Sequence, residues 1–204
     1  MLLPRFYINR IFALTSVLEF DFYHNTYNMK ICGIDPGIVN LGYCIVQDGY
    51  ILRAGVATLD RKAPFFSELK HFARYLKKYG PFDAVLIERQ MKSKFKICQT
   101  HLLHLFAPVS IIIAPQTIKR YFNYSGMKCY KQRKLRAIEL TKNLCRENKQ
   151  MELFEKCVRG REKLDDVCDS YLIAHYGYTE FHKLKFNNDE VEKDWSKKRK
   201  IFEV

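Results

Sequence analysis

Residues 30–37 read KICGIDPG, an apolar run that ends at Asp35 and a Pro-Gly pair. An apolar run of this length before two breakers predicts a buried β-strand with a carboxylate at its end. Residues 41–47 resume the β pattern, and the turn pair Asp-Gly at 48–49 leads into a third β pattern over residues 50–58. The chain is therefore expected to open with three antiparallel strands.

Further along the chain, helical and β signals alternate. Helices are predicted where apolar residues recur every three or four positions, and strands where short apolar runs lie between breakers. The expected elements are a helix over residues 64–79, a strand over 83–87, a helix over 93–106, a strand over 109–114, and helices over 117–122, 131–147, 151–158 and 164–176. This order predicts an α/β fold, with a mixed sheet of three antiparallel strands extended by two parallel strands and helices on both faces.

The length of 204 residues and the hydrophobic content of 48% suit one α/β domain with a sizeable core. We place this domain at residues 29–182, between an N-terminal extension over residues 1–28 and a polar C-terminal tail over residues 183–204. We expect either that residues 1–28 are a poorly ordered extension or that translation starts at Met29, which directly precedes the first strand. The first residues contain arginines and then acids without a small-residue cleavage site, so we do not expect export.

The seven cysteines are odd in number and form no C-x-x-C pair, which favours a reduced, intracellular protein. No stretch of the sequence approaches the roughly 18 consecutive apolar residues of a membrane span, so no membrane association is expected.

Positive charge is concentrated in one part of the chain. The formal net charge is +13, and residues 92–146 contain twelve Lys and Arg residues against one acid, Glu139. A basic surface of this density favours a polyphosphate partner such as nucleic acid, with an acidic protein partner or a solvated face as the alternatives.

Four acids stand out by their positions. Asp35 closes the first strand, Glu88 closes the apolar run at 84–87, and Asp166 and Asp169 lie three residues apart on one face of the last helix. Carboxylates that converge from three elements repel one another unless a cation intervenes, and Mg²⁺ or Mn²⁺ suits such oxygen ligands. Two ions about 3.5–4 Å apart would activate a water and stabilise the leaving oxygen of a phosphodiester.

Each acid also has a structural interpretation. An Asp before Pro-Gly commonly forms a turn, Glu88 can pair with Arg89 or a nearby lysine, and acids in a first helical turn favour the helix dipole. Acids at two strand ends and on one helix face together favour the metal site.

Four sequence blocks resemble the RuvC-type Holliday-junction resolvases, and among these the poxvirus branch most. The blocks are IDPG with NLGY at 34–43, IERQM at 87–91, APQTIK at 114–119 and DVCDSYLIA at 166–174. They occur in the order of the family, with similar spacing, and the resemblance covers about residues 29–180. It implies a ribonuclease-H-like fold for a RuvC-like nuclease domain.

The resemblance also implies roles for individual residues. Asp35, Glu88, Asp166 and Asp169 correspond to the metal-binding carboxylates of the family, with two ions per active site. Lys119 falls on a family lysine that follows a strand. Lys131 lies close to a second family lysine, in a loop of slightly different length, so Lys128 competes for that role. Asp165 shares a helix face with Asp169 and is an additional candidate.

The activity implied by the resemblance is structure-selective cutting of DNA. Such an enzyme resolves four-way junctions and branched or concatemeric viral DNA by paired, metal-dependent nicks, and a poxvirus member would work in the cytoplasm of the infected cell. Two other functions stay open. One is a different ribonuclease-H-like nuclease that cuts hybrids or flaps, and the other is a non-catalytic basic module that binds nucleic acid.

The resemblance implies a symmetric homodimer, which would match the two-fold symmetry of a four-way junction. The helix that begins near Ser93 contains more apolar residues than one core face requires, so we nominate it as the dimer helix. Packing of that helix on the sheet is the alternative, and a Leu102→Glu variant would separate the two.

Two further patterns have weaker interpretations. His101 and His104 have the helical spacing of zinc ligands, but no third ligand lies near them in sequence. Four aromatic residues alternate with cations, which suits contact with unstacked bases or, equally, packing in the core; they are Tyr121, Phe122, Tyr124 and Tyr130.

Overall fold

A computed structural model describes residues 28–160 and 164–186 of the chain. The predicted extension up to residue 27, and the predicted tail from residue 187 with its basic run at 197–200, lie outside the described residues. No helix in the described ranges is both long and apolar enough to cross a membrane.

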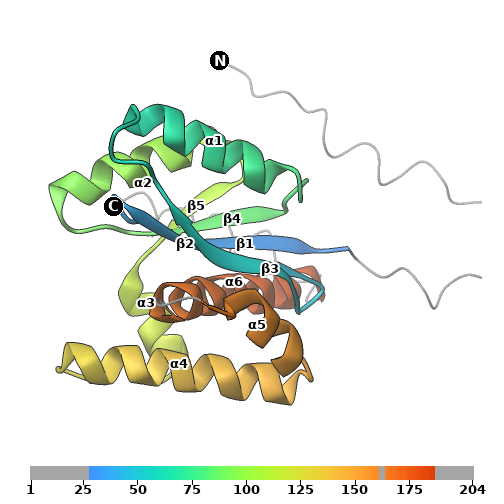
Figure 1. The fold of residues 1–204 in the computed structure, drawn as a ribbon. Coiled ribbons are helices and arrows are strands. Elements are labelled where there is room, and N and C mark those ends of the chain that lie inside the picture. The colour runs from blue at the N-terminus through green and yellow to red at the C-terminus, as the bar shows by residue number, and fades with distance from the viewer. Residues whose placement is uncertain (1–27, 161–163, 187–204) are drawn as a thin grey trace, which may run out of the picture.

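A single five-stranded mixed sheet forms the centre of the molecule (Figure 1). Its strands lie in the order β3 (Tyr50–Thr58), β2 (Asn40–Gln47), β1 (Lys30–Asp35), β4 (Ala84–Glu88) and β5 (Ser110–Ile113). The first three strands pair antiparallel, whereas β4 runs parallel to β1 and β5 runs parallel to β4. The predicted sheet of three antiparallel strands extended by two parallel strands is confirmed.

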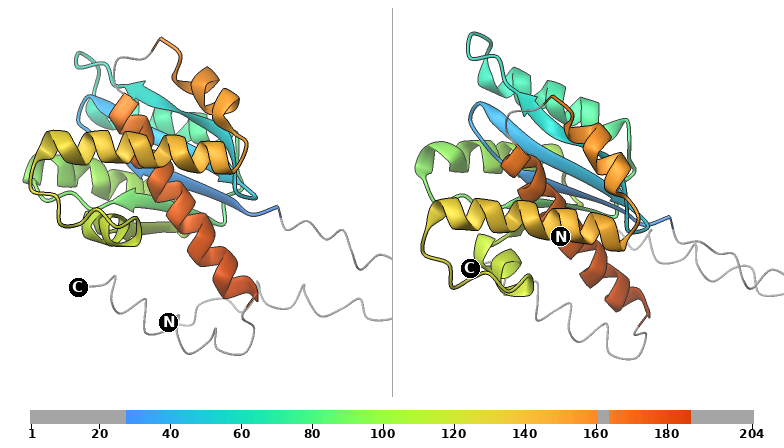
Figure 2. Two further views of the ribbon diagram at one scale, coloured as in Figure 1. Left: turned by 90° about the horizontal axis from the view of Figure 1, so that it is seen from below. Right: turned by 60° about the horizontal axis from the view of Figure 1, so that its bottom comes forward.

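Helices cover both faces of this sheet (Figures 1 and 2). One face packs against α1 (Phe65–Lys77) and α2 (Ser93–Leu105). The other face packs against α6 (Leu164–Phe186), and α5 (Met151–Val158) contacts the same sheet at β3. Two further helices pack against α6, namely α3 (Pro115–Tyr121) and α4 (Tyr130–Glu147). Each face thus has its own apolar core, and the sheet lies between the two.

The last helix runs further than the sequence pattern predicts. It continues past the expected end at Tyr176 to Phe186, so the predicted domain end at residue 182 falls inside α6. Beyond Tyr176 the helix still packs on the core, because Tyr178 and Phe181 are partly buried against it. These contacts stabilise turns that periodicity alone does not mark as helical.

The apolar residues of α2 mostly serve the protein's own core. Cys98, Leu102 and Phe106 are buried against the sheet, and Leu103 and Leu105 are partly buried beside them. The prediction that the helix has more apolar residues than one core face requires is therefore wrong for these residues, because they face the sheet. Leu102→Glu would disrupt the core and cannot test a dimer.

Two glycines let α6 lie very close to the sheet. A Cβ atom on Gly33 of β1 would lie 2.4 Å from the backbone oxygen of Ser170 and 2.5 Å from the backbone nitrogen of Ala174. A Cβ atom on Gly42 of β2 would lie 2.2 Å from the backbone oxygen of Asp166. Backbone atoms of a helix cannot rotate out of the way as a flexible side chain can. A larger residue at either position therefore pushes α6 away from the sheet.

We expect Gly33→Ala to lower the free energy of unfolding by about 1–3 kcal/mol or more, because its methyl group would overlap helix backbone. Gly126→Ala is the matched control, since a Cβ atom there has no neighbour within 4 Å among the described residues. Urea denaturation of both variants measures the difference. Equal stability of the two variants would contradict the close contact.

Candidate active site

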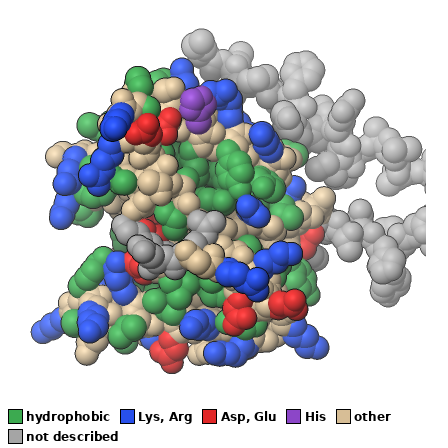
Figure 3. All heavy atoms as spheres, in the orientation of Figure 1, with side chains coloured by type: hydrophobic (Ala, Val, Ile, Leu, Met, Phe, Trp, Pro, Cys, Tyr) green, Lys and Arg blue, Asp and Glu red, His purple; other side chains and the backbone are tan. Residues whose placement is uncertain are grey.

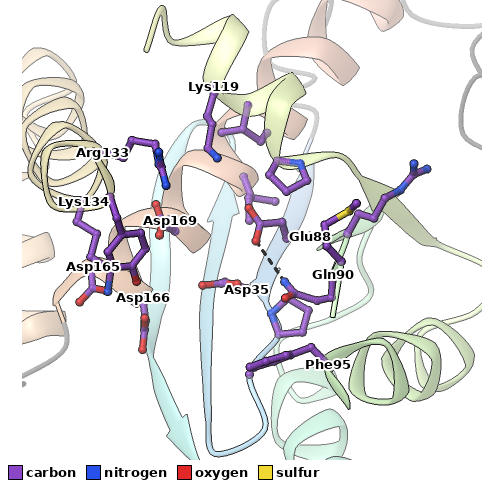
Figure 4. A pocket seen from close by; sticks show the side chains of 18 of the residues that line it. Asp35, Glu88, Gln90, Phe95, Lys119, Arg133, Lys134, Asp165, Asp166 and Asp169 are labelled. Carbon is purple, nitrogen blue, oxygen red and sulfur yellow. Dashed lines mark hydrogen bonds and ion pairs between the residues drawn. The ribbon is translucent and has the colours of Figure 1, made fainter. Parts of the chain in front are cut away.

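A cleft of about 460 Å³ opens at the ends of β1 and β4 (Figure 4). The register of these parallel strands places Ile34 opposite Ile87, so the residues that follow them, Asp35 and Glu88, lie side by side. Asp166 and Asp169 reach the same cleft from the first turns of α6. The structure therefore brings all four predicted carboxylates together.

Burial and mutual repulsion act on these carboxyl groups. Burial raises the pKa of Asp35 well above its ordinary value, and the charges of Glu88, Asp169 and Asp166 raise it further. For Asp169, burial and then the charges of Glu88, Asp165 and Asp166 raise the pKa to about 7. Four ionised carboxylates are therefore unfavourable together at neutral pH without a cation between them.

Glu88 has a more mixed environment. Burial raises its pKa, while a hydrogen bond with Asp35 and the charge of Lys119 lower it. The amide Nε2 of Gln90 donates a hydrogen bond to Glu88 Oε2 at 3.2 Å (Figure 4). The backbone N–H of Gln90 donates in turn to Gln99 Oε1 at 2.6 Å. Gln99 thus connects α2 to a site carboxylate, a contact that nothing in the sequence pattern indicates.

The cations in the cleft differ in part from the predicted set. Lys119 lines the cleft as expected, but Lys131 and Lys128 do not. Arg133 and Lys134, from the first turn of α4, line it instead. A shift of two or three residues along a helix start decides which side chain faces the acids, and sequence spacing does not resolve such a shift.

These two cations have different partners. Arg133 Nη1 donates hydrogen bonds to the backbone oxygens of Met127 and Lys128 at 3.0 and 2.7 Å, so it holds the loop before α4. Lys134 forms an ion pair with Asp165 at the side of the cleft. The additional acid candidate, Asp165, is therefore engaged with a lysine.

The carboxylates do not yet form a coordination sphere. Asp35, Glu88 and Asp169 surround one space, whereas the carboxyl group of Asp166 is directed away from it (Figure 4). Within residues 28–160 and 164–186, no three His, Cys, Asp or Glu side chains are close enough to hold one ion as they stand. The donor set nevertheless fits a hard divalent cation, because it consists of buried carboxylates that repel one another.

The other predicted features lie in different surroundings. Tyr124 is buried and lines the cleft, and Phe122 packs against the core. Tyr130 is 63% exposed, with the ammonium of Lys134 at 4.8 Å from its ring centroid. His101 packs on the ring of Phe66 at 4.6 Å between centroids. The aromatic set therefore divides between the core and the rim of the cleft.

The sheet order, with acids at two adjacent strand ends and on the helix that crosses them, defines the ribonuclease-H-like class of folds. Within this class, the family described as Poxvirus A22 protein matches residues 29–178, and the chain belongs to that family. The predicted family resemblance is thereby confirmed. None of the curated proteins matches the chain significantly.

Several solved structures share this fold. The fowlpox virus resolvase in complex with Holliday junction DNA has a TM-score of 0.54 and 22% identity, over 74% of this chain and 97% of that one. RuvC from Thermus thermophilus has a TM-score of 0.53 and 16% identity, over 74% and 97% of the two chains. The yeast mitochondrial Holliday junction resolvase has a TM-score of 0.52 and 18% identity, over 72% and 77%.

The raised carboxyl pKa values have a measurable consequence for stability. The folded, metal-free protein keeps a proton that the unfolded chain releases, so its stability falls as pH rises from about 4 through the pKa of about 7 of Asp169. We expect Asp35→Asn to raise the unfolding free energy at pH 7.5 in EDTA by about 1–3 kcal/mol, and to leave it nearly unchanged at pH 4.

Urea denaturation at the two pH values measures this effect. Glu152→Gln, on the exposed face of α5, is the control that removes a carboxylate outside the cleft. An Asp35→Asn protein no more stable than the wild type at pH 7.5 would show that the carboxylates do not repel one another.

Proposed function

We propose that this protein is a metal-dependent endodeoxyribonuclease that resolves four-way DNA junctions. The observation that carries the proposal is the convergence of Asp35, Glu88, Asp166 and Asp169 in one cleft that also holds Lys119 and Lys134. Carboxylates for a divalent cation next to cations for a phosphate are the groups that phosphodiester hydrolysis needs.

Two divalent ions, Mg²⁺ or Mn²⁺, are part of the proposal. When bound, they supply an activated water and stabilisation of the leaving oxygen. The chain's part is to hold the ions through the four carboxylates, with Glu88 oriented by Gln90. Burial and then the charges of Glu88, Asp169 and Asp166 raise the pKa of Asp35, and bound divalent ions would offset this repulsion.

We assign contact with the scissile phosphate to Lys119 and Lys134. Lys119 lines the cleft and its charge lowers the pKa of Glu88, so its ammonium acts at the carboxylates. Lys134 is held at the side of the cleft by Asp165. A phosphate group that enters the cleft competes with Asp165 for this ammonium, and each lysine stabilises charge on the phosphate oxygens.

Cations outside the cleft support binding of a long polyanion. Of the twelve basic residues of the sequence stretch at 92–146, four line the cleft, namely Lys92, Lys119, Arg133 and Lys134. The other eight belong to α2, α3, α4 and the segment before α4. Lys and Arg side chains lie over both the upper and the lower part of the face shown in Figure 3. Binding through these contacts weakens as salt concentration rises.

The substrate follows from the relatives. The fowlpox virus resolvase and Thermus thermophilus RuvC are both solved with Holliday junction DNA. With the family membership, this supports four-way DNA junctions as the substrate. The proposal extends the substrate to branched or concatemeric viral DNA and gives the cytoplasm of the infected cell as the place of action. A ribonuclease-H-like nuclease for hybrids and a non-catalytic binding module are the alternatives that the experiments below distinguish.

The proposal includes a homodimer, because two active sites related by a two-fold axis fit a junction with the same symmetry. The outer face of α1 and α2 offers an apolar surface for it: Ile97 is 56% exposed and Phe66 is 41% exposed, and Phe66 packs on His101. The dimer helix is then α2 as nominated, but through Ile97 rather than through the buried Leu102.

We expect the protein to nick a synthetic four-way junction at symmetric positions in Mg²⁺ or Mn²⁺ and not in EDTA. Asp35→Asn should lower the cleavage rate by at least about 10²–10³-fold while it retains junction binding, because the ligand is lost but the basic surface is kept. Gel assays with end-labelled strands measure both properties. Cleavage of RNA–DNA hybrids alone, or binding without cleavage, would support one of the alternatives.

The assignment of phosphate contact to Lys134 and its assignment to Lys131 predict different cleavage rates for the alanine variants. Lys134→Ala should slow cleavage at saturating enzyme by about 10²-fold, and Lys131→Ala by much less, because only Lys134 lines the cleft. Single-turnover kinetics of the two variants measure the ratio. A larger loss in Lys131→Ala would return the role to the residue predicted from the sequence.

For the dimer, we expect sedimentation velocity to show a shift to monomer in Ile97→Glu, since a charge would be buried at the interface. Leu153→Glu, a leucine on α5 with 38% exposure, is the matched control. A dimer that persists in Ile97→Glu would exclude this face of α2.

A further inference from the structure

A second cleft, of about 730 Å³, adjoins the carboxylate cleft. It lies between residues 37–40, the segment 59–65 that joins β3 to α1, and the first turn of α2. The two clefts share residues from three elements, namely Gly37, Asn40, Phe95 and Asp166. The volume is within the range of about 300–1,000 Å³ for ligand sites. A strand held at the carboxylates can therefore extend directly into this second cleft.

The walls of the second cleft are fixed by hydrogen bonds within the protein. The backbone N–H of Leu59 donates to the oxygen of Val39 at 2.7 Å, which ties two walls together. The backbone N–H of Asp60 donates to Glu68 Oε2 at 3.1 Å, and that of Lys62 donates to Asp60 Oδ1 at 2.8 Å. The cleft is thus formed before a ligand binds, so little conformational entropy is lost on binding.

The lining combines apolar walls with cations. Ile38, Leu59, Phe65 and Phe95 supply the apolar part. Arg61 and Lys94 are exposed at the cleft, and the Lys94 ammonium lies 5.4 Å from the ring centroid of Phe95. The acid Asp60 is engaged by the backbone of its own loop. An apolar, partly aromatic space beside cations matches a nucleotide, which joins a flat base to a phosphate.

Asn40 supplies polar groups at the boundary of the two clefts. Its Oδ1 accepts a hydrogen bond from the hydroxyl of Thr58 at 3.2 Å, and the Asn40 side chain makes no other hydrogen bond with the described residues. The two N–H donors of its amide therefore remain for acceptor atoms of a ligand, such as those on the edge of a base.

We propose that the second cleft binds one nucleotide of the cleaved strand, next to the scissile phosphate, with its base unstacked. The base packs on Phe95 and Ile38, and Lys94 and Arg61 bind its phosphate. This inference rests on the proposed function and adds a source of substrate selectivity. Unstacking costs least where a base is already unpaired, so a nucleotide at a branch point enters the cleft more readily than one within a duplex.

Fluorescence of 2-aminopurine tests this nucleotide site. The probe is placed in turn at each nucleotide that flanks the cut, and the junction is bound to Asp35→Asn protein so that cleavage does not interfere. We expect a severalfold rise at one position, lost when Phe95→Ala is added and retained when Tyr50→Ala is added. Tyr50 is the control, because it is an exposed aromatic residue on β3 that lines neither cleft and lies outside the proposed dimer surface.

A second measurement combines the Phe95→Ala variant with a junction that lacks one base. An abasic nucleotide at the bright position should slow wild-type cleavage about tenfold, as expected for one lost base–aromatic contact. Phe95→Ala should slow cleavage of the intact junction similarly and cause no further loss on the abasic junction. If Phe95→Ala slows cleavage of the intact and the abasic junction by the same factor relative to the wild type, the nucleotide site is wrong. It is also wrong if the 2-aminopurine fluorescence rises at no position.

The two proposals fail in different ways. If the junction is cut normally but no flanking position brightens, the nucleotide site is wrong and the proposed function stands. If no divalent metal supports cleavage, the proposed function fails, and the fluorescence measurement still decides on the nucleotide site because it requires only binding.

Discussion

The close approach of α6 to β1 and β2 is the contact on which the active-site cleft depends. Gly33 and Gly42 leave no side chain between the sheet and the helix backbone, so Ser170 and Asp166 lie directly on the strands. The register then places Asp35 opposite Gly42, next to the start of α6. Two acids from the helix and two from strand ends therefore line one cleft without any long loop to position them.

The gathering of four carboxyl groups in one cleft has an electrostatic cost, and this cost favours a divalent cation. Burial and repulsion raise the pKa values of Asp35 and Asp169, so the metal-free cleft opposes full ionisation. A divalent cation reverses that cost, which couples ion binding to stability and to pH. Hydrogen bonds fix one of these acids in place: Gln99 on α2 accepts one from the backbone of Gln90, and the Gln90 amide donates one to Glu88.

The two clefts divide the work of recognition in the proposed enzyme. The carboxylate cleft takes the phosphate to be cut, with Lys119 and Lys134 assigned to contact it among the cations that line the cleft. The adjoining cleft takes a base, with Phe95 as the wall that both share. Selection of branched DNA then depends on the low cost of unstacking at a branch point as well as on the two-fold geometry of a dimer.

Local sequence patterns predict the three antiparallel strands, the two strands that extend them and the acids at strand ends, because periodicity and breakers are properties of neighbouring residues. The spacing of Asp166 and Asp169 likewise predicts their common helix face. The folded chain shows in addition that Lys134 rather than Lys131 lines the cleft, that Leu102 is buried, and that α6 continues to Phe186. These outcomes depend on strand register and on how closely helices pack, which are set by contacts between elements far apart in the chain.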